Sequence, residues 1–268
     1  MKRQRPKNPG WRALETPAGL GAPQPLIVRV ESLPARSYFV EHSHSWHQLV
    51  YAVTGVLTVS AEGRSIAISP EQAVWLPTGS KHSVGSLLGA EFRSLWVAHQ
   101  ACPDISPDVA VFEVSGLLRA LIVEGATLNP AEDRDYTNRV VALILDQLRR
   151  ARTATAALPW PKHPALLALC EALYADPANA RDADRWGYEL GMSTRTLTRH
   201  FEQEVGMSLR DWRVRLRLFK AIELLCGEAP ITDIALDLGY ASASAFIYMF
   251  RKEMGCSPLQ YRRRLGGT

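Results

Sequence analysis

The sequence predicts a multidomain α+β protein, in which a β-barrel precedes an all-α domain with two helix-turn-helix units. Three observations carry this prediction. Short β-like segments with glycine turns run from about residue 26 to residue 99. A helical spacing of apolar residues follows from residue 107 and stops at a proline-containing stretch, 158–164. Beyond that stretch the sequence is helical and contains a pattern that occurs twice.

The same changes of pattern predict the domain boundaries. Residues 1–24 are rich in proline, glycine and basic residues without periodicity, which is typical of a flexible tail. We expect the barrel to occupy residues 25–106, a helical linker 107–157, and the domain with the repeat 158–268. A chain of 268 residues is long enough for two domains of ordinary size.

The predicted strands of the barrel are short runs of apolar or alternating residues. They cover 48–53, 56–59, 65–68 and 73–76. Glycine-containing turns separate them, at 54–55, 62–63 and 77–79. Strands of this length and spacing favour a sandwich or a barrel.

Composition limits the function only loosely. The net charge of +4 is mildly basic, which is compatible with a nucleic-acid partner without requiring one. The cysteines lie far apart and form no CxxC pair, so a reducing compartment is favoured over a disulfide framework or a zinc site. No apolar run approaches the roughly 20 residues that span a bilayer, and none follows the basic N-terminus. We therefore expect a cytoplasmic protein with no membrane partner.

The first copy of the repeat has the parts of a helix-turn-helix unit, at about 183–205. A supporting helix leads to Gly191, where a left-handed turn is inexpensive. Ser193 is placed to cap the next helix by accepting a backbone N–H bond. Leu197 and Phe201, four residues apart, hold that helix to the core.

The second copy, at about 231–254, has the same parts. Gly239 turns, Ser242 caps, and Phe246 and Phe250 anchor the second helix. From Leu197 and Phe246 onward the copies keep an offset of 49 residues, and the turn differs by one residue. Two such units indicate a protein that reads two neighbouring stretches of DNA.

A long helix is predicted between the two units, over 209–226. Its length of about 17 residues corresponds to roughly 25 Å. Such a rod is suited to hold two recognition helices near one turn of DNA apart, about 34 Å, on one face of the duplex.

Residues 181–263 resemble the DNA-binding domain of the AraC/XylS family of transcription regulators. The matching residues include Gly191, Ser193, Arg195, Leu197, Arg199, Phe201, Gly206, Trp212, Arg217, Ala221, Ile234, Ala235, Leu238, Gly239, Phe246, Phe250, Gly255, Pro258 and Tyr261. The resemblance implies that both recognition helices enter adjacent major grooves of promoter DNA. The alternative reading is an all-helical interaction domain whose arginines are ordinary solvated charges.

The resemblance and the outward positions together predict the residues that touch DNA. Base-reading residues are expected at Thr194, Arg195, Thr198, Arg199, Ala243, Ser244, Ile247 and Tyr248. Phosphate contacts are expected at Ser193, Arg213, Arg215, Ser242, Arg251 and Arg262. Because only the first helix carries arginines at these places, we expect it to supply most of the hydrogen-bond specificity. The second helix should read mainly thymine methyl groups and DNA shape.

A group of histidines lies in the β region. His42-Ser-His44, followed by His47 and Gln48, and later Pro77-x-Gly-x-x-His82, resembles the two motifs of the cupin fold. The resemblance implies a possible divalent metal at His42, His44, Gln48 and His82. Gln48 stands where cupins have glutamate, and a neutral amide is the poorer ligand, so His47 is an alternative. Metal-free use of these side chains in a polar effector site stays equally open.

A cupin before an AraC-type domain implies a regulator whose barrel binds a small effector. It also implies a homodimer and RNA polymerase as partners. Residues 133–152 would then be a dimerisation helix with a stripe of Val140, Ile144 and Leu148 against a second copy. The alternative is that the stripe packs on the barrel of its own chain. A cupin metalloenzyme of the dioxygenase kind is the competing function, and the replacement of the glutamate by Gln48 argues against it. We therefore expect no enzymatic activity.

Overall fold

The computed structural model describes residues 11–16, 21–69, 72–102, 104–154, 157–225 and 227–266, with side chains up to Arg263. The chain forms two compact units, and the boundary between them in the sequence lies between Ala157 and Leu158.

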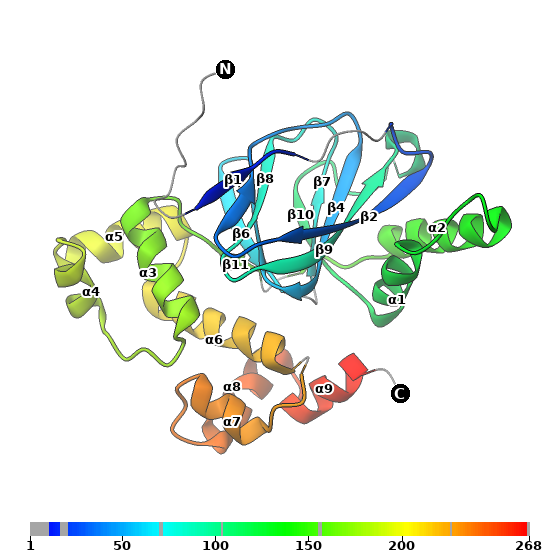
Figure 1. The fold of residues 1–268 in the computed structure, drawn as a ribbon. Helices are drawn as coiled ribbons and strands as arrows, with labels where there is room; N and C mark the ends of the chain where they lie inside the picture. Colours follow the sequence, from blue (N-terminus) through cyan, green and yellow to red (C-terminus); the bar gives the residue numbers. More distant parts are fainter. Residues whose placement is uncertain are drawn as a thin grey trace. The chain divides into compact units, whose positions relative to one another are not determined.

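The first unit contains two facing β-sheets, which confirms the predicted barrel-like architecture (Figure 1). One sheet has the order β1 (Arg12–Leu14), β3 (Ser37–Phe39), β8 (His82–Ser86), β5 (Leu57–Ala61) and β6 (Arg64–Ile68). The other has the order β10 (Ala110–Glu113), β7 (Gln72–Leu76), β4 (His47–Gly55), β9 (Ala90–Val97) and β2 (Leu26–Leu33). A short 3₁₀ helix, η1 (His99–Ala101), follows β9.

Strand β4 divides its side chains between two cores. Val50 and Ala52 join a cluster with Leu57 and Val84 of the opposite sheet, so this face points between the sheets. Leu49 and the residues of its parity lie on the other face, in a cluster with the helices that follow the barrel. The alternation of a strand therefore decides which β4 residues can reach the barrel interior.

Two helices cover that outer face: α1 (Gly116–Gly125) and α2 (Arg134–Arg149). Val140, Ile144 and Leu148 are buried there against the strands of their own barrel. The expectation that this stripe contacts a second copy is therefore wrong. The outer face of β4 and β9 is apolar and must itself be covered, and the stripe does so.

Two strands of this unit lie where the sequence pattern predicts none. β1 falls in the predicted tail and pairs in parallel with β3, and Leu14 packs on the barrel core. Residues 1–10 and 17–20 of that tail lie outside the described residues. β10 falls in the predicted helical linker and pairs with β7. Both segments are too short for periodicity to reveal them.

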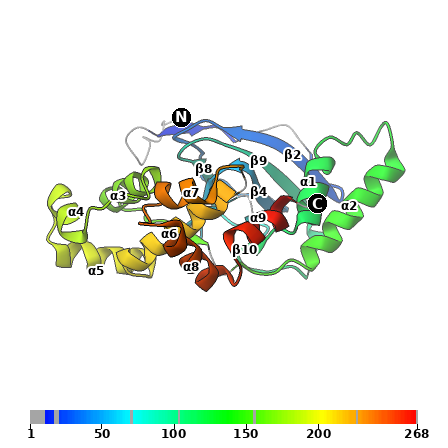
Figure 2. The same cartoon turned by 90° about the horizontal axis from the view of Figure 1, so that it is seen from below.

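The second unit is helical apart from β11 (Leu158–Pro159). Its helices are α3 (Pro164–Ala175), α4 (Ala183–Glu189), α5 (Thr194–Val205), α6 (Leu209–Leu225), α7 (Ile231–Asp237), α8 (Ala243–Met254) and α9 (Pro258–Gly266). The pairs α4–α5 and α7–α8 lie at opposite ends of α6, and Figure 2 shows the same arrangement from below. This confirms the two predicted helix-turn-helix units.

Each pair packs on its own aromatic core. In the first, Phe201 and Trp160 contact the ring of Trp212, whose Nε1–H donates to the Pro159 carbonyl at 2.7 Å. In the second, Phe250 contacts Phe246 and Tyr261. Cys102, Cys170 and Cys256 are buried free thiols, and Cys226 lies outside the described residues. Among the described helices, none has the length and apolar character needed to cross a bilayer.

Candidate nucleic-acid interface and ligand site

The second helix of each pair begins in the same way. Gly191 and Gly239 adopt left-handed φ angles of 66° and 76°, a conformation that glycine accepts without strain. Ser193 Oγ then accepts from the Thr196 N–H, and Ser242 Oγ accepts from the Ala245 N–H, both at 3.2 Å. These caps leave the exposed N-termini of α5 and α8 with a fixed start and direction.

Helix α5 presents two arginines to solvent. Leu197 and Phe201 are buried on one face, and Arg195 and Arg199 are exposed on another. Neither guanidinium has a hydrogen-bond or ion-pair partner within the described part of the chain. By contrast, the predicted base-reading residues Thr194 and Thr198 already use their hydroxyl hydrogens, because Thr194 donates to the Asp184 carboxylate and Thr198 to the Thr194 carbonyl.

Helix α8 presents fewer donors. Ser244 is exposed, and Tyr248 has an exposed fraction of 74%. Ala243 and Ile247, which we expected to face outward, are half-buried and pack on the core around Phe246. They lie one turn apart on the flank of the helix, so their methyl groups serve the core as well as the surface.

Two of the predicted phosphate contacts make hydrogen bonds within the chain. Arg213 on α6 donates from Nη1 to the Arg181 carbonyl at 2.6 Å and from Nη2 to the Asn179 carbonyl. Arg262 on α9 donates from Nη2 to the Ala229 carbonyl at 2.6 Å. Arg213 therefore holds the segment that leads into α4, and Arg262 holds the segment that leads into α7. Burial lowers the pKa of Arg213.

Three of the other four predicted phosphate contacts are exposed, and the fourth is half-buried. Arg251 is exposed in the last turn of α8, and Arg215 is half-buried on α6. Ser193 and Ser242 are exposed at the helix N-termini. A helix N-terminus with free backbone N–H groups is a suitable partner for a phosphate oxygen.

In the barrel half of the chain, three of the predicted histidines lie together at one end of the barrel. We call them the histidine cluster (His42, His44 and His82). The ring centroid of His82 is 4.3 Å from that of His42 and 5.0 Å from that of His44. Each Nδ1–H donates to a backbone carbonyl, at Val40, Trp46 and Ser80 respectively. Burial lowers the pKa of His42, and it lowers that of His82 to about 4, so both rings are neutral at pH 7.

Gln48 extends the histidine cluster into the barrel. Its Oε1 lies 2.9 Å from His44 Nε2, so both nitrogens of His44 already have oxygen partners. Its Nε2 donates to Ser94 Oγ at 2.6 Å, and Trp96 Nε1–H donates to the same hydroxyl. Among the described residues, no group of three or more His, Cys, Asp or Glu side chains is arranged to hold a metal ion. The amide that replaces the cupin glutamate thus occupies a nitrogen that a metal would need.

His47 does not replace the missing ligand. The Thr78 N–H donates to its Nδ1 at 3.1 Å, and its Nε2 lies 3.1 Å from His99 Nδ1. Its ring stacks on Trp75, which belongs to the outer core. His47 and Gln48 are neighbours in a strand and therefore point to opposite faces, a parity that the sequence itself contains. No motif marks His99, so its contact with His47 does not follow from the sequence.

Three buried polar atoms near the histidine cluster have no hydrogen-bond partner among the described residues: Arg29 Nη1, Trp46 Nε1 and His82 Nε2. A series of ring contacts connects them. The Arg29 guanidinium lies 4.4 Å from the centroid of Trp96, Trp96 lies 4.5 Å from Trp46, and Trp46 stacks on His44 at 5.0 Å. Arg29 Nε also pairs with Glu31 at 2.8 Å. Buried polar atoms are normally satisfied, so these three atoms are exceptions within the described part of the chain.

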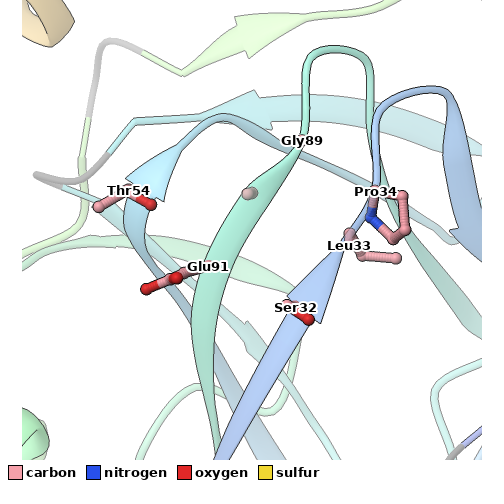
Figure 3. Close-up of a pocket in the computed structure, with 7 residues that line it drawn as sticks. Ser32, Leu33, Pro34, Thr54, Gly89 and Glu91 are labelled. Carbon is pink, nitrogen blue, oxygen red and sulfur yellow. The ribbon is translucent and has the colours of Figure 1, made fainter.

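A hollow of about 320 Å³ lies elsewhere on the barrel (Figure 3). It is lined by Ser32, Leu33, Pro34, Thr54, Gly89, Ala90 and Glu91. These residues lie at the end of β2 and β4 and the start of β9, whereas Gln48 and Trp96 lie at the opposite ends of β4 and β9. None of the predicted ligand-binding residues reaches it.

Comparison with known proteins fits both halves of this description. Residues 25–101 match the family model described as an AraC-like ligand binding domain, and residues 186–264 match a helix-turn-helix domain. The HTH-type transcriptional regulator NimR of Escherichia coli (strain K12) is 30% identical over 225 residues, which cover 84% of this chain and 82% of NimR. The chain belongs to the AraC family of transcription regulators.

A further relative and a solved structure differ in how much of their length matches this AraC-family chain. The transcriptional activator RhaS of Escherichia coli O157:H7 is 37% identical over 103 residues, 38% of this chain and 36% of RhaS. A solved structure of ToxT from Vibrio cholerae covers 91% of this chain and 100% of ToxT, with 14% identity and a TM-score of 0.40. The chain is thus a DNA-binding regulator with a ligand-binding domain, and its relatives are regulators rather than enzymes.

Proposed function

We propose that α5 and α8 enter two successive major grooves of a promoter, and that α5 supplies most of the base-specific hydrogen bonds. The observation that carries this proposal is the exposed pair Arg195 and Arg199, one turn apart behind a capped N-terminus and without a partner among the described residues. Arginine donates to guanine O6 and N7 in the major groove. Ser193, Ser242, Arg215 and Arg251 are then the phosphate-facing groups.

A duplex that the full-length protein selects from a random-sequence pool tests this proposal. A hydroxyl-radical footprint should show two protected segments about one helical turn apart, and base substitutions under α5 should weaken binding more than those under α8. Protection of a single groove would contradict the two-helix reading. Greater sensitivity under α8 would reverse the assignment of the specificity.

We propose that the effector binds at the histidine cluster without a metal ion. Within the described ranges, Arg29 and Trp46 have buried N–H groups without a partner, and His82 has a buried nitrogen without one. A fitting effector carries an acceptor group, such as a carboxylate, for the first two and an N–H or O–H donor for the third. Its planar part would lie against the rings of Trp46 and Trp96.

The metal-free reading has a direct test in purified protein. Elemental analysis and titration with Zn²⁺, Ni²⁺ or Mn²⁺ should find no stoichiometric metal in the wild type. Gln48→Glu adds the carboxylate that cupins have, and should create metal binding there. A stoichiometric metal in the wild type that is lost in His82→Ala would overturn the proposal.

We also propose that the regulator acts in the cytoplasm as a homodimer and meets RNA polymerase at the promoter. Since α2 uses its main apolar stripe on its own barrel, the dimer contact would involve the remaining exposed apolar side chains. Leu117 on α1 and Leu143 on α2 have exposed fractions of 54% and 47%. Light scattering of the wild type and of Leu143→Asp tests this: a dimer that the substitution leaves intact would place the contact elsewhere.

A further inference from the structure

One segment of the helical unit lies between α6 and the turn of the second helix-turn-helix unit. We call residues 177–181, which lead into α4, the spacer segment. Two arginines one turn apart on α6 hold its backbone. Arg213 donates to the Asn179 and Arg181 carbonyls, and Arg217 Nε–H donates to the Pro177 carbonyl at 3.3 Å. The spacer segment is therefore fastened along one side to α6.

The other side of the spacer segment meets the turn before α8. A Cβ atom added at Gly239 would lie 2.7 Å from Ala178 Cα and 3.1 Å from Ala178 Cβ, distances that real Cβ atoms hardly reach. The guanidinium of Arg217 also lies 5.6 Å from the centroid of the Tyr240 ring, the residue after Gly239. Arg217 thus contacts both the spacer segment, which leads into the first helix-turn-helix unit, and the turn of the second helix-turn-helix unit.

The corresponding turn of the first helix-turn-helix unit, at Gly191, makes no such contact with the described residues. Gly191 has nearly the same left-handed backbone, with φ of 66° against 76° at Gly239. A Cβ atom added at Gly191 would meet nothing within 4 Å in the described part of the chain. The left-handed backbone explains a glycine at both positions. Of the two, only Gly239 also lies so close to a neighbouring backbone that a side chain has no room.

We infer that the spacer segment, with Arg217 and Gly239, sets the separation and relative rotation of α5 and α8, and so the half-site spacing that the regulator accepts. This inference rests on the proposed reading of DNA by both helices. A single helix such as α6 fixes distance along its axis, whereas a contact beside the axis resists bending and twisting of one unit against the other. Arg217 and Gly239 act as positioning residues, since neither is placed on a DNA-reading face.

The inference is tested by changing the DNA and the protein together. One base pair inserted between the half-sites increases their separation by about 3.4 Å and rotates one relative to the other by about 34°. The probe is the duplex that wild-type, full-length protein selects, with its two footprints mapped, and versions of it with one base pair added or removed. Affinities are measured at one salt concentration for wild type, Gly239→Ala and Gly191→Ala.

The two glycine variants form a matched pair. Both introduce a side chain into a left-handed backbone, but only Gly239→Ala pushes on Ala178. Wild type and Gly191→Ala should lose about tenfold or more in affinity when a base pair is inserted, as for a mismatched contact. Gly239→Ala should bind the original duplex more weakly and lose less than about twofold on insertion. Equal loss on insertion in both glycine variants and the wild type would overturn the inference.

Arg217→Lys provides a second variant, in case Gly239→Ala fails to fold. It keeps the charge but loses the Nε–H donor and the planar group beside Tyr240, and should also flatten the spacing dependence. A spacing dependence as steep as in the wild type would count against the inference. A wild-type footprint confined to one groove would contradict the two-helix reading itself, and the inference with it.

Discussion

The two helix-turn-helix units share a backbone plan but differ in what their side chains do. In both, a left-handed glycine, a serine cap and a pair of buried apolar residues shape the second helix. The first helix-turn-helix unit exposes Arg195 and Arg199, which have no partner in the part of the chain that the structure describes. The second exposes Ser244 and Tyr248 and packs its turn against Ala178. Under the two proposals above, the first helix-turn-helix unit reads bases and the second sets the register, a division that a shared motif does not imply.

The largest effect should come from the arginines of α5. Arg195→Ala with Arg199→Ala removes two possible contacts to guanine, each with about 1–3 kcal/mol of discrimination, so specific binding should fall by about a hundredfold or more. Ser244→Ala with Tyr248→Ala is the matched double variant of α8 and should lose less. Mobility-shift titrations on the selected duplex measure both. Equal losses would remove the division of labour between the units.

Gly239→Ala and Gly191→Ala should separate the units by stability as well. A side chain in a left-handed backbone costs about 1–2 kcal/mol, which both variants share. Gly239→Ala adds the close approach to Ala178, so its total should be larger by about 1 kcal/mol or more. Hydrogen exchange of the α4–α5 and α7–α8 amides reports each unit by itself. If α7–α8 opens no more readily in Gly239→Ala than α4–α5 does in Gly191→Ala, the Ala178 contact carries little energy.

The same contrast explains what the sequence could and could not predict. Ser193, Ser242 and the glycines act on backbone within a few residues, so their roles follow from local rules. Arg213 and Arg262 act on carbonyls 32 to 34 residues away, and a sequence shows only that they are basic. In the barrel, His42, His44, Gln48 and His82 do come together as expected. The different direction of His47 depends on strand parity, and the unpaired nitrogen of Arg29 depends on a neighbouring strand, neither of which a motif reveals.

Arg213 separates an internal role from a role on DNA. Arg213→Gln removes its hydrogen bonds to the backbone, and charged hydrogen bonds are worth about 1.5–3 kcal/mol each before solvent reduces them at this half-buried site. The α4–α5 amides should therefore exchange faster. The slope of log affinity against log salt should stay as in the wild type, whereas Arg251→Ala should reduce it by about one. A reduced slope in Arg213→Gln would return this arginine to the phosphate contacts.

The smallest effect should be the one that does not distinguish the units. Ser193→Ala and Ser242→Ala each remove a cap whose Oγ accepts from a backbone N–H at 3.2 Å. Loss of such a cap typically costs about 1 kcal/mol, and both sites are exposed, so water can partly replace the acceptor in each. The first-turn amides of α5 and α8 should lose protection to the same degree by hydrogen exchange. A clearly larger loss at α8 would mean that its N-terminus depends on the cap more than that of α5, and that the shared plan already differs at the level of the backbone.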